Sequence, residues 1–222
     1  MRNIKLAEGE FYHIYNRGVD KRIIFSHKKD FDRFFESMEI FNTKESVGNL
    51  TRYDSKEEKE RLVDFIAYCI NPNHFHFIIT PLIEKGIERF MHKLCMGYSK
   101  YFNAKYRRSG TLFQGKFKAI HIDTDEYLLH LSAYVNLNDK AHRHHGNSRS
   151  SWREYLESDM DGLCKKDIVL DHFKNRSEYA KFAKDTLKNI VERKLLLKSL
   201  EYEPLSFPLT PSVNIVSNKK KR

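Results

Sequence analysis

The chain has 222 residues, 40% hydrophobic and 32% charged, with only 9 Gly and 5 Pro, a composition that excludes wholesale disorder and fibrous structures. Three cysteines without CxxC spacing exclude a disulfide framework and a thiolate zinc site, and no apolar run reaches the ~20 residues of a membrane-spanning helix. Forty Lys and Arg against thirty Asp and Glu give a net charge of +10, which favours a polyanionic partner such as nucleic acid.

The first part of the chain alternates between strand and helix patterns. Phe11 to Asn16 is aromatic and β-branched and predicts a strand, and Lys28 to Asn42 has apolar residues at helical spacing. Leu62 to Ile70 is a near-continuous apolar run, which predicts a strand buried on both faces. Residues 71–73 predict a turn, and His74 to Thr80 predicts a third strand that pairs back as a hairpin.

Three more elements follow before the character of the chain changes. Ile87 to Phe102 predicts a long amphipathic helix, and Lys116 to Ile122 alternates like a fourth strand. A further helix starts with Thr124 as its N-cap and runs to about Leu137. The order β-α-β-β-α-β predicts an α+β protein with a ferredoxin-like sheet, to which the last helix is added.

The pattern predicts three regions. Residues 8–142 form a first domain that contains the sheet, and residues 143–202 form a helical C-terminal appendage, with helices at Ile168 to Phe173 and Ser177 to Leu200. Residues 203–222 are rich in proline and end in basic residues, which predicts a flexible basic tail.

The third predicted strand carries a pair of histidines. Side chains alternate across a strand, so His74 and His76 project from one face while Phe75, Phe77 and Ile79 project from the other. The apolar row suits the face that two helices cover in such a sheet. The two imidazoles then lie on the opposite face, close enough together to hold one metal ion.

The last helix of the first domain offers partners for this pair. Tyr134 and Asn138 are four residues apart, so a helix places them on the same face. Asn138 would add an oxygen ligand, which suits Mg²⁺ or Mn²⁺, and Tyr134 would be left as the nucleophile. Two alternatives stay open: Tyr134 is a packing residue of an apolar stripe, or Tyr127, seven residues earlier, is the reactive tyrosine.

Several ordered blocks of the sequence share a resemblance. His74-Phe75-His76 resembles the HUH motif of single-tyrosine HUH transposases, in which two histidines flank a bulky apolar residue. Further blocks resemble the same family in the same order, at residues 11–18, 101–103, 108–118 and 127–138. The resemblance covers residues 8–142 and is greatest to the REP-associated tyrosine transposases.

The resemblance implies a site and a reaction. His74, His76 and Asn138 match the family's ligands for a divalent metal ion, Mg²⁺ or Mn²⁺, and Tyr134 matches its nucleophile. One departure is Asp139, which stands where the family usually has proline. The implied enzyme is a DNA transposase that cuts and rejoins single-stranded DNA beside a hairpin through a 5′-phosphotyrosine, with residues 8–142 as its catalytic domain.

The same resemblance sets the expected partners. The expected partner is single-stranded, hairpin-flanked DNA, and no membrane partner is expected. The expected location is the cytoplasm, at the bacterial nucleoid. Both a homodimer and a monomer are compatible with the family. Seven side chains are candidates for DNA contact, the cations for phosphates and the glutamine for a base edge: Arg17, Lys21, Arg22, Arg108, Gln114, Lys116 and Lys118. Solvated surface charge is the alternative for each cation.

Other function classes fit the sequence less well. A non-catalytic RRM-like nucleic-acid-binding module would explain the charge and the sheet, but it gives no role to the histidines, Tyr134 and Asn138. A hydrolase that activates water would need a carboxylate near the histidines, and none lies between Cys69 and Thr80. Residues 110–116 match the spacing of a phosphate-binding loop, but Phe117 stands at its Ser/Thr position.

Overall fold

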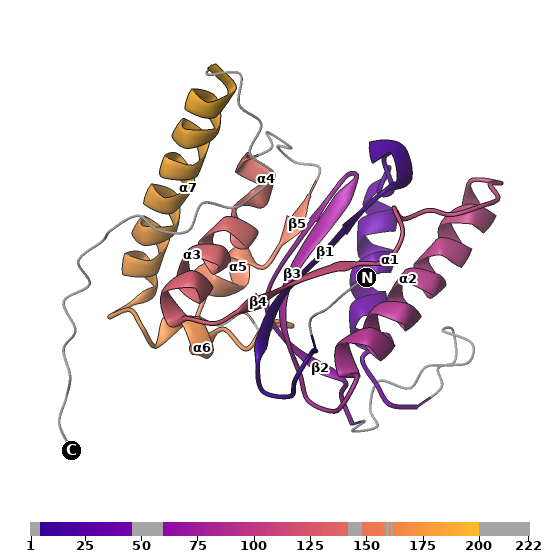
Figure 1. Ribbon diagram of the computed structural model, residues 1–222, viewed down its shortest axis with the longest axis horizontal. Coiled ribbons are helices and arrows are strands. Elements are labelled where there is room, and N and C mark those ends of the chain that lie inside the picture. Colours follow the sequence, from indigo (N-terminus) through magenta and orange to yellow (C-terminus); the bar gives the residue numbers. More distant parts are fainter. Residues whose placement is uncertain (1–4, 46–59, 142–147, 159, 161, 200–222) are drawn as a thin grey trace.

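The computed structural model describes residues 5–45, 60–141, 148–158, 160 and 162–199. Within these residues, an antiparallel sheet lies between two groups of helices (Figure 1). Its strands are β1 (Phe11–Arg17), β2 (Val63–Asn71), β3 (His74–Pro81), β4 (Lys118–Ile122) and β5 (Arg149–Ser150). The helices are α1 (Lys28–Ile40), α2 (Gly86–Lys105), α3 (Asp125–Asn136), α4 (Asn138–Ala141), α5 (Trp152–Leu156), α6 (Asp167–Leu170) and α7 (Arg176–Ser199), with a short 3-10 helix at Val19–Lys21.

The strands are ordered β4-β1-β3-β2-β5, and each neighbouring pair is antiparallel. The predicted mixture of helices with an antiparallel sheet is therefore confirmed, and the elements from β1 to β4 follow the predicted order. The register places Tyr15 of β1 between His76 of β3 and Lys118 of β4, and Arg17 beside His74. The end of β1 thus lies next to the histidine pair.

The fifth strand, at Arg149 and Ser150, is not among the elements expected from the sequence, which placed only helices in this part of the chain. These residues pair with Cys69 and Ile70 at the edge of β2. The pairing continues through Ser151, whose N–H donates to the Tyr68 carbonyl at 3.0 Å and whose hydroxyl accepts from the Tyr68 N–H at 2.9 Å. A local sequence pattern does not reveal such contacts between distant segments, so this strand could not be predicted from it.

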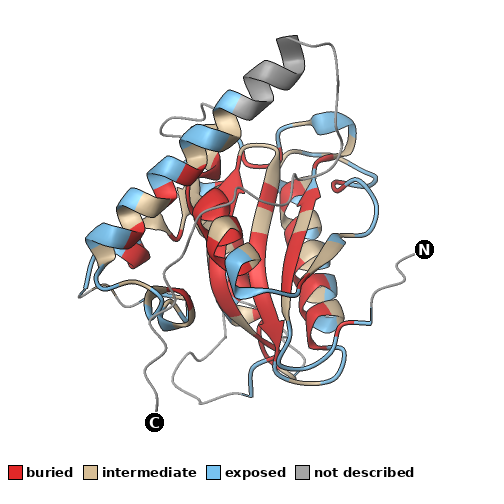
Figure 2. Ribbon diagram, turned by 60° about the vertical axis from the view of Figure 1, so that its left-hand side comes forward, coloured by how far each residue is buried: buried red, intermediate tan, exposed pale blue. Residues whose placement is uncertain are grey.

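One face of the sheet is covered by α1 and α2 (Figure 1), and most of the sheet is buried (Figure 2). The contact between this face and the two helices is made by aromatic rings. Phe34 of α1 is fully buried, and its ring centroid lies 5.4 Å from that of Phe75 and 4.9 Å from that of Tyr98 in α2. Phe75 and Phe77 are stacked at 4.6 Å. The predicted apolar row of β3 therefore faces these two helices, as expected, and forms the larger core.

The other face is covered by α3 together with the helices that follow it (Figure 1). Tyr155 of α5 donates a hydrogen bond to the Ile66 carbonyl of β2 at 2.7 Å, and the Tyr179 hydroxyl of α7 accepts one from Asn136 of α3 at 2.8 Å. The segment predicted as an appendage thus packs on the same sheet as α3. The predicted tail, residues 203–222, lies outside the described residues, as do residues 142–147.

Helix α3 begins where the sequence predicts and ends one residue earlier. The Thr124 hydroxyl accepts a hydrogen bond from the Tyr127 N–H at 3.2 Å, so the predicted N-cap is confirmed. Leu137 leaves the helical conformation, with φ −113° and ψ 17°, so that Asn138 opens α4 instead of continuing α3. Within the described residues, no helix is long and apolar enough to cross a membrane.

Candidate active site between the sheet and helix α3

The two histidines of β3 lie side by side on the face of the sheet that α3 covers. The ring centroids of His74 and His76 are 5.3 Å apart, and the ring planes are nearly perpendicular. Both side chains are half-buried, in contrast to Phe75 and Phe77, which are fully buried on the other face. The alternation of β3 therefore produces a polar row in which each imidazole keeps some contact with solvent.

Tyr134 of α3 packs against this row. Its ring centroid lies 5.8 Å from that of His76 in an edge-to-face arrangement, and the side chain is 7% exposed. Burial raises the pKa of Tyr134 above its usual value, and hydrogen bonding from Asn138 partly offsets this effect. The phenol is therefore protonated at neutral pH and must lose its proton when it reacts.

Two buried asparagines connect α4 to the histidines. The amide nitrogen of Asn71 donates to Oδ1 of Asn138 at 2.7 Å and lies 2.9 Å from Nε2 of His74. Oδ1 of Asn138 is itself 3.2 Å from the same Nε2. Although α3 and α4 are separate helices, the chain brings Asn138 to the position that the four-residue spacing to Tyr134 predicted.

The hydrogen bonds of His74 show which of its nitrogens carries the proton. Nδ1 lies 2.6 Å from Oδ1 of Asn73, and the orientation of that amide is fixed because its nitrogen donates to the Lys21 carbonyl at 3.1 Å. An amide oxygen only accepts, so Nδ1 of neutral His74 is protonated and Nε2 presents a lone pair.

This arrangement fits a divalent cation. The lone pair of His74 Nε2 and the acceptor-only Oδ1 of Asn138 lie 3.2 Å apart and face the same donor, the amide of Asn71. Two imidazole nitrogens and one amide oxygen form a donor set suitable for Mn²⁺ or Mg²⁺. In the part of the chain that the structure describes, there is no cluster of three or more His, Cys, Asp or Glu side chains that could hold a metal ion, so this donor set depends on the oxygen of Asn138.

Two further side chains of β1 belong to the same cluster and were not singled out from the sequence. Nε2 of His13 lies 2.8 Å from Nδ1 of His76, and the ring of Tyr15 stacks on both imidazoles, at 5.0 Å from His13 and 5.6 Å from His76. Burial lowers the pKa of His13 to about 3, so this residue is neutral at physiological pH. Their alternation on β1 was visible in the sequence, but the pairing of β1 with β3 was not.

Three of the candidate DNA contacts lie beside this cluster. Arg17 is the cross-strand neighbour of His74, and its Nε donates to Oε1 of Gln114. Lys118 lies opposite Tyr15, with its ammonium 5.9 Å from the centre of that ring. Together with the histidines, these side chains form a polar track, defined here as His74, His76, Tyr15, Arg17, Gln114 and Lys118.

The other candidate cations are not brought to the track by any described contact. Lys21 and Lys116 are exposed. Arg22 lies 3.8 Å from Asp20 in the loop after β1. Arg108 hydrogen bonds to Asn103 at 3.3 Å, beyond the end of α2.

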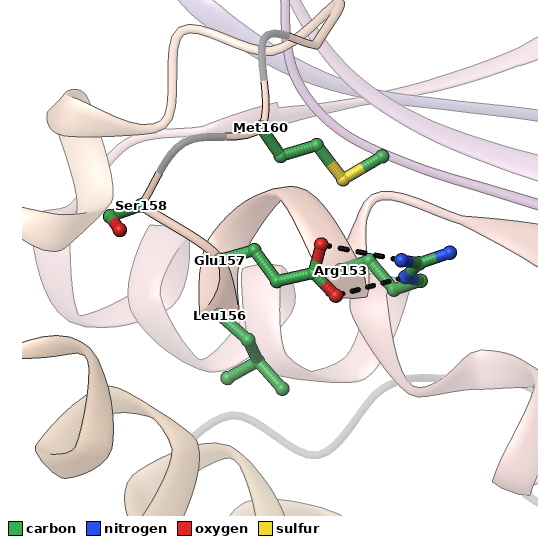
Figure 3. A pocket seen from close by; sticks show the side chains of 5 residues that line it. All are labelled: Arg153, Leu156, Glu157, Ser158 and Met160. Carbon is green, nitrogen blue, oxygen red and sulfur yellow. Dashed lines mark hydrogen bonds and ion pairs between the residues drawn. The ribbon is translucent and has the colours of Figure 1, made fainter.

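A pocket beside α5 contains none of the residues of this cluster (Figure 3). Its main polar feature is a two-point ion pair between Arg153 and Glu157, with N–O distances of 3.1 and 3.3 Å. Leu156, Ser158 and Met160 complete its lining. The two charges are paired with each other within one helical turn, so neither is left as an unpaired charge for catalysis.

Comparison with known proteins points to one family. Residues 37–138 match the family model described as "Transposase IS200 like". Among solved structures, a REP-associated tyrosine transposase bound to a REP hairpin is similar to this chain, with a TM-score of 0.49, 12% identity, and coverage of 73% of this chain and 88% of that chain. No curated protein sequence matches the chain.

The matched segment contains four of the side chains that form the site. His74 and His76 on β3, Tyr134 on α3 and Asn138 at the start of α4 all lie within residues 37–138, whereas His13, Tyr15 and Arg17 of β1 precede them. Residues 37–138 are therefore similar to the IS200-like transposases.

Proposed function

We propose that this protein is a metal-dependent transposase that cleaves and rejoins single-stranded DNA beside a hairpin, with Tyr134 as its nucleophile. The match of residues 37–138 to the model of IS200-like transposases, a family that cleaves and rejoins DNA, supports the reaction class. The observation that carries the assignment of residues is the convergence of Tyr134 and Asn138 on the histidine pair, with Oδ1 of Asn138 3.2 Å from Nε2 of His74.

The proposed reaction exchanges one phosphate ester for another. The Tyr134 oxygen attacks the scissile phosphorus and loses its proton, the bond from phosphorus to the 3′ oxygen breaks, and that oxygen leaves with a proton as a 3′-OH. The product is a 5′-phosphotyrosine. Because the ester bond is conserved, the reverse attack by a 3′-OH rejoins a strand without ATP.

His74, His76 and Asn138 are the side chains that would hold the cation. When bound, Mg²⁺ or Mn²⁺ supplies Lewis-acid stabilisation of the negative charge that develops on the phosphate. The chain contributes the orientation of the phenol: Tyr134 is fixed by its packing against His76 and by its contact with Asn138, so little rotational freedom is lost when it attacks.

The polar track supports the assignment of the substrate. Arg17 and Lys118 place two cations beside the histidines, where a strand that enters the site would present its phosphates, and Tyr15 offers a ring for an unpaired base. Preference for a hairpin rests on the resemblance to REP-associated tyrosine transposases. Lys21, Arg22, Arg108 and Lys116 are proposed as outlying phosphate contacts.

The same proposal extends to the organisation of the protein. We assign the β1 to β4 region to the ferredoxin-like class, because the strand order β4-β1-β3-β2 and the crossovers through α1 and α2 match that arrangement. Residues 8–142 act as the catalytic and DNA-binding domain at the bacterial nucleoid in the cytoplasm, and helices α5 to α7 form a C-terminal addition that packs on the same side of the sheet as α3. The mass of the protein in solution distinguishes a monomer from a homodimer.

The test uses labelled single-stranded oligonucleotides with a hairpin and Mn²⁺, analysed on denaturing gels. The wild-type protein is expected to form a covalent DNA adduct. Tyr134→Phe is expected to abolish it, because only the nucleophilic oxygen is removed. Tyr127→Phe is the matched control on the same helix and should retain the adduct.

The other outcomes separate the rival functions. An adduct that survives in Tyr134→Phe but not in Tyr127→Phe would move the nucleophile to Tyr127. Cleavage without any adduct would indicate a hydrolase that uses water. Retention of DNA without cleavage would favour an RRM-like module, although α3 covers the sheet face on which such modules stack bases.

A further inference from the structure

The hydrogen bond between His13 and His76 has no part in the mechanism above. Nε2 of His13 lies 2.8 Å from Nδ1 of His76, and the two rings are almost parallel. A hydrogen bond between two neutral imidazoles needs one protonated and one bare nitrogen, so one ring donates and the other accepts. The direction of this bond decides which nitrogen of His76 presents a lone pair to the site.

The surroundings of His13 favour one direction when no cation is bound. Its second nitrogen, Nδ1, is buried and has no hydrogen-bond partner among the described residues. A buried N–H without a partner is rarer in proteins than an acceptor without one. The proton of His13 therefore belongs on Nε2, which donates to Nδ1 of His76, and the proton of His76 is then on its own Nε2.

That arrangement cannot persist when His76 binds a cation, because a metal ligand needs a lone pair. With Nε2 of His76 bare, its proton moves to Nδ1 and is donated to Nε2 of His13, whose own proton is then on Nδ1. The pair carries two protons before and two after, so no proton is released by these two rings.

We propose that His13 is a positioning residue for the cation, and that the His13–His76 hydrogen bond reverses its direction when the cation binds. This inference rests on the proposed function, since it takes His76 as a ligand. His13 fixes the orientation of the His76 ring in both states, because imidazole can exchange donor for acceptor at the same nitrogen. An apolar side chain could do neither.

The direct test is ring-nitrogen NMR of ¹⁵N-labelled full-length protein, which distinguishes protonated from bare nitrogens, without and with Mg²⁺. In the metal-free protein, His76 is expected to carry its proton on Nε2 and His13 on Nε2. With Mg²⁺, both rings should carry it on Nδ1. If His76 has the same tautomer in both samples, or if His13 does, the inference is wrong.

Substitutions provide a second readout, the affinity for Mn²⁺ measured by electron paramagnetic resonance. His13→Phe should weaken Mn²⁺ binding by about 10- to 100-fold, the usual cost of losing a partner of a metal ligand. His13→Gln should weaken Mn²⁺ binding less than His13→Phe does, because a glutamine amide can also donate or accept a hydrogen bond. The control His121→Phe, on β4 with Glu10 as partner, should leave the affinity unchanged. Equal affinity in wild type and His13→Phe would contradict the proposal.

The adduct assay separates this inference from the proposed function. If wild-type protein forms the Tyr134 adduct with Mn²⁺ while the tautomers do not change with Mg²⁺, only the role of His13 is rejected. If the wild-type protein neither binds Mn²⁺ nor forms an adduct, the metal-dependent mechanism and the inference both fail.

Discussion

The two faces of the sheet use the same strands for opposite purposes. On the face towards α1 and α2, β3 contributes Phe75 and Phe77, which are fully buried among aromatic rings. On the face towards α3, the alternate residues His74 and His76 are half-buried and hydrogen bonded to asparagine and histidine side chains. A period of two along one strand thus separates the stability of the protein from its chemistry.

The comparison predicts that a substitution on each face damages a different property. Phe34→Ala removes a ring that contacts Phe75 and Tyr98, and should lower the free energy of unfolding by about 3–5 kcal/mol. Urea unfolding followed by circular dichroism measures this change. The folded fraction of the variant should still form the DNA adduct, because Phe34 does not contact the polar face.

His76→Gln is the counterpart on the other face. It should change the free energy of unfolding by about 1 kcal/mol or less, because the side chain is half-buried and already polar. Adduct formation should be lost. If Phe34→Ala and His76→Gln have equal effects on stability, the division of labour between the faces is wrong.

A buried charge between α1 and α2 extends the comparison of the two faces. Asp30 is fully buried and accepts hydrogen bonds from Lys105 at 2.5 Å and from Tyr106 at 2.6 Å, as well as from the backbone at the start of α1. Burial by itself raises the pKa of Asp30, but these hydrogen bonds outweigh it, so the pKa lies below its usual value. The ionised carboxylate therefore ties the end of α2 to the start of α1.

Asp30→Asn should lower the free energy of unfolding at pH 7 by about 1.5–3 kcal/mol, the usual worth of hydrogen bonds to a charged group. A lowered pKa in the folded state means that the contribution is complete above the unfolded value, about 3.9, and is lost as pH falls through the folded value. The difference in the free energy of unfolding between wild type and Asp30→Asn should thus be constant from pH 5 to 7 and become smaller below about pH 4. A gap that persists at pH 2 would contradict this role.

The smallest effect is expected at the exposed end of β1. Arg17→Gln removes one cation from the polar track, so it should reduce the slope of log affinity for single-stranded DNA against log salt by about 0.7. Fluorescence anisotropy at several salt concentrations measures the slope. Arg153→Gln is the matched control, because Arg153 is paired with Glu157 on α5 (Figure 3) and should not change it. Equal slopes for both variants would remove Arg17 from the DNA interface.

The parts of the fold that depend on local pattern were predictable. Alternation in β3 assigned His74 and His76 to one face, and Thr124 marked the start of α3. The strand β5 was not predicted, because its two residues form a strand only through contacts with β2 and Tyr68.

Only those site residues whose positions follow from a local sequence pattern could be predicted. The spacing of Tyr134 and Asn138 pointed to a shared position, although the chain reaches it through two helices. The places of His13 and Asn71 depend on the register of β1 with β3 and of β2 with β3, which a single sequence does not reveal. Asn71 was predicted only as a turn residue, yet its amide donates to Asn138 and contacts His74.

The central claim is that the Tyr134 oxygen becomes covalently attached to DNA. The most direct measurement is tandem mass spectrometry of the adduct formed by wild-type protein with a hairpin-flanked single strand and Mn²⁺, after nuclease and trypsin digestion. Tyr127 and Tyr134 both lie between Lys118 and Lys140, so one tryptic peptide carries both and its fragments distinguish them. The account predicts that the nucleotide remnant is on Tyr134; a remnant on Tyr127 or Tyr15 would contradict it.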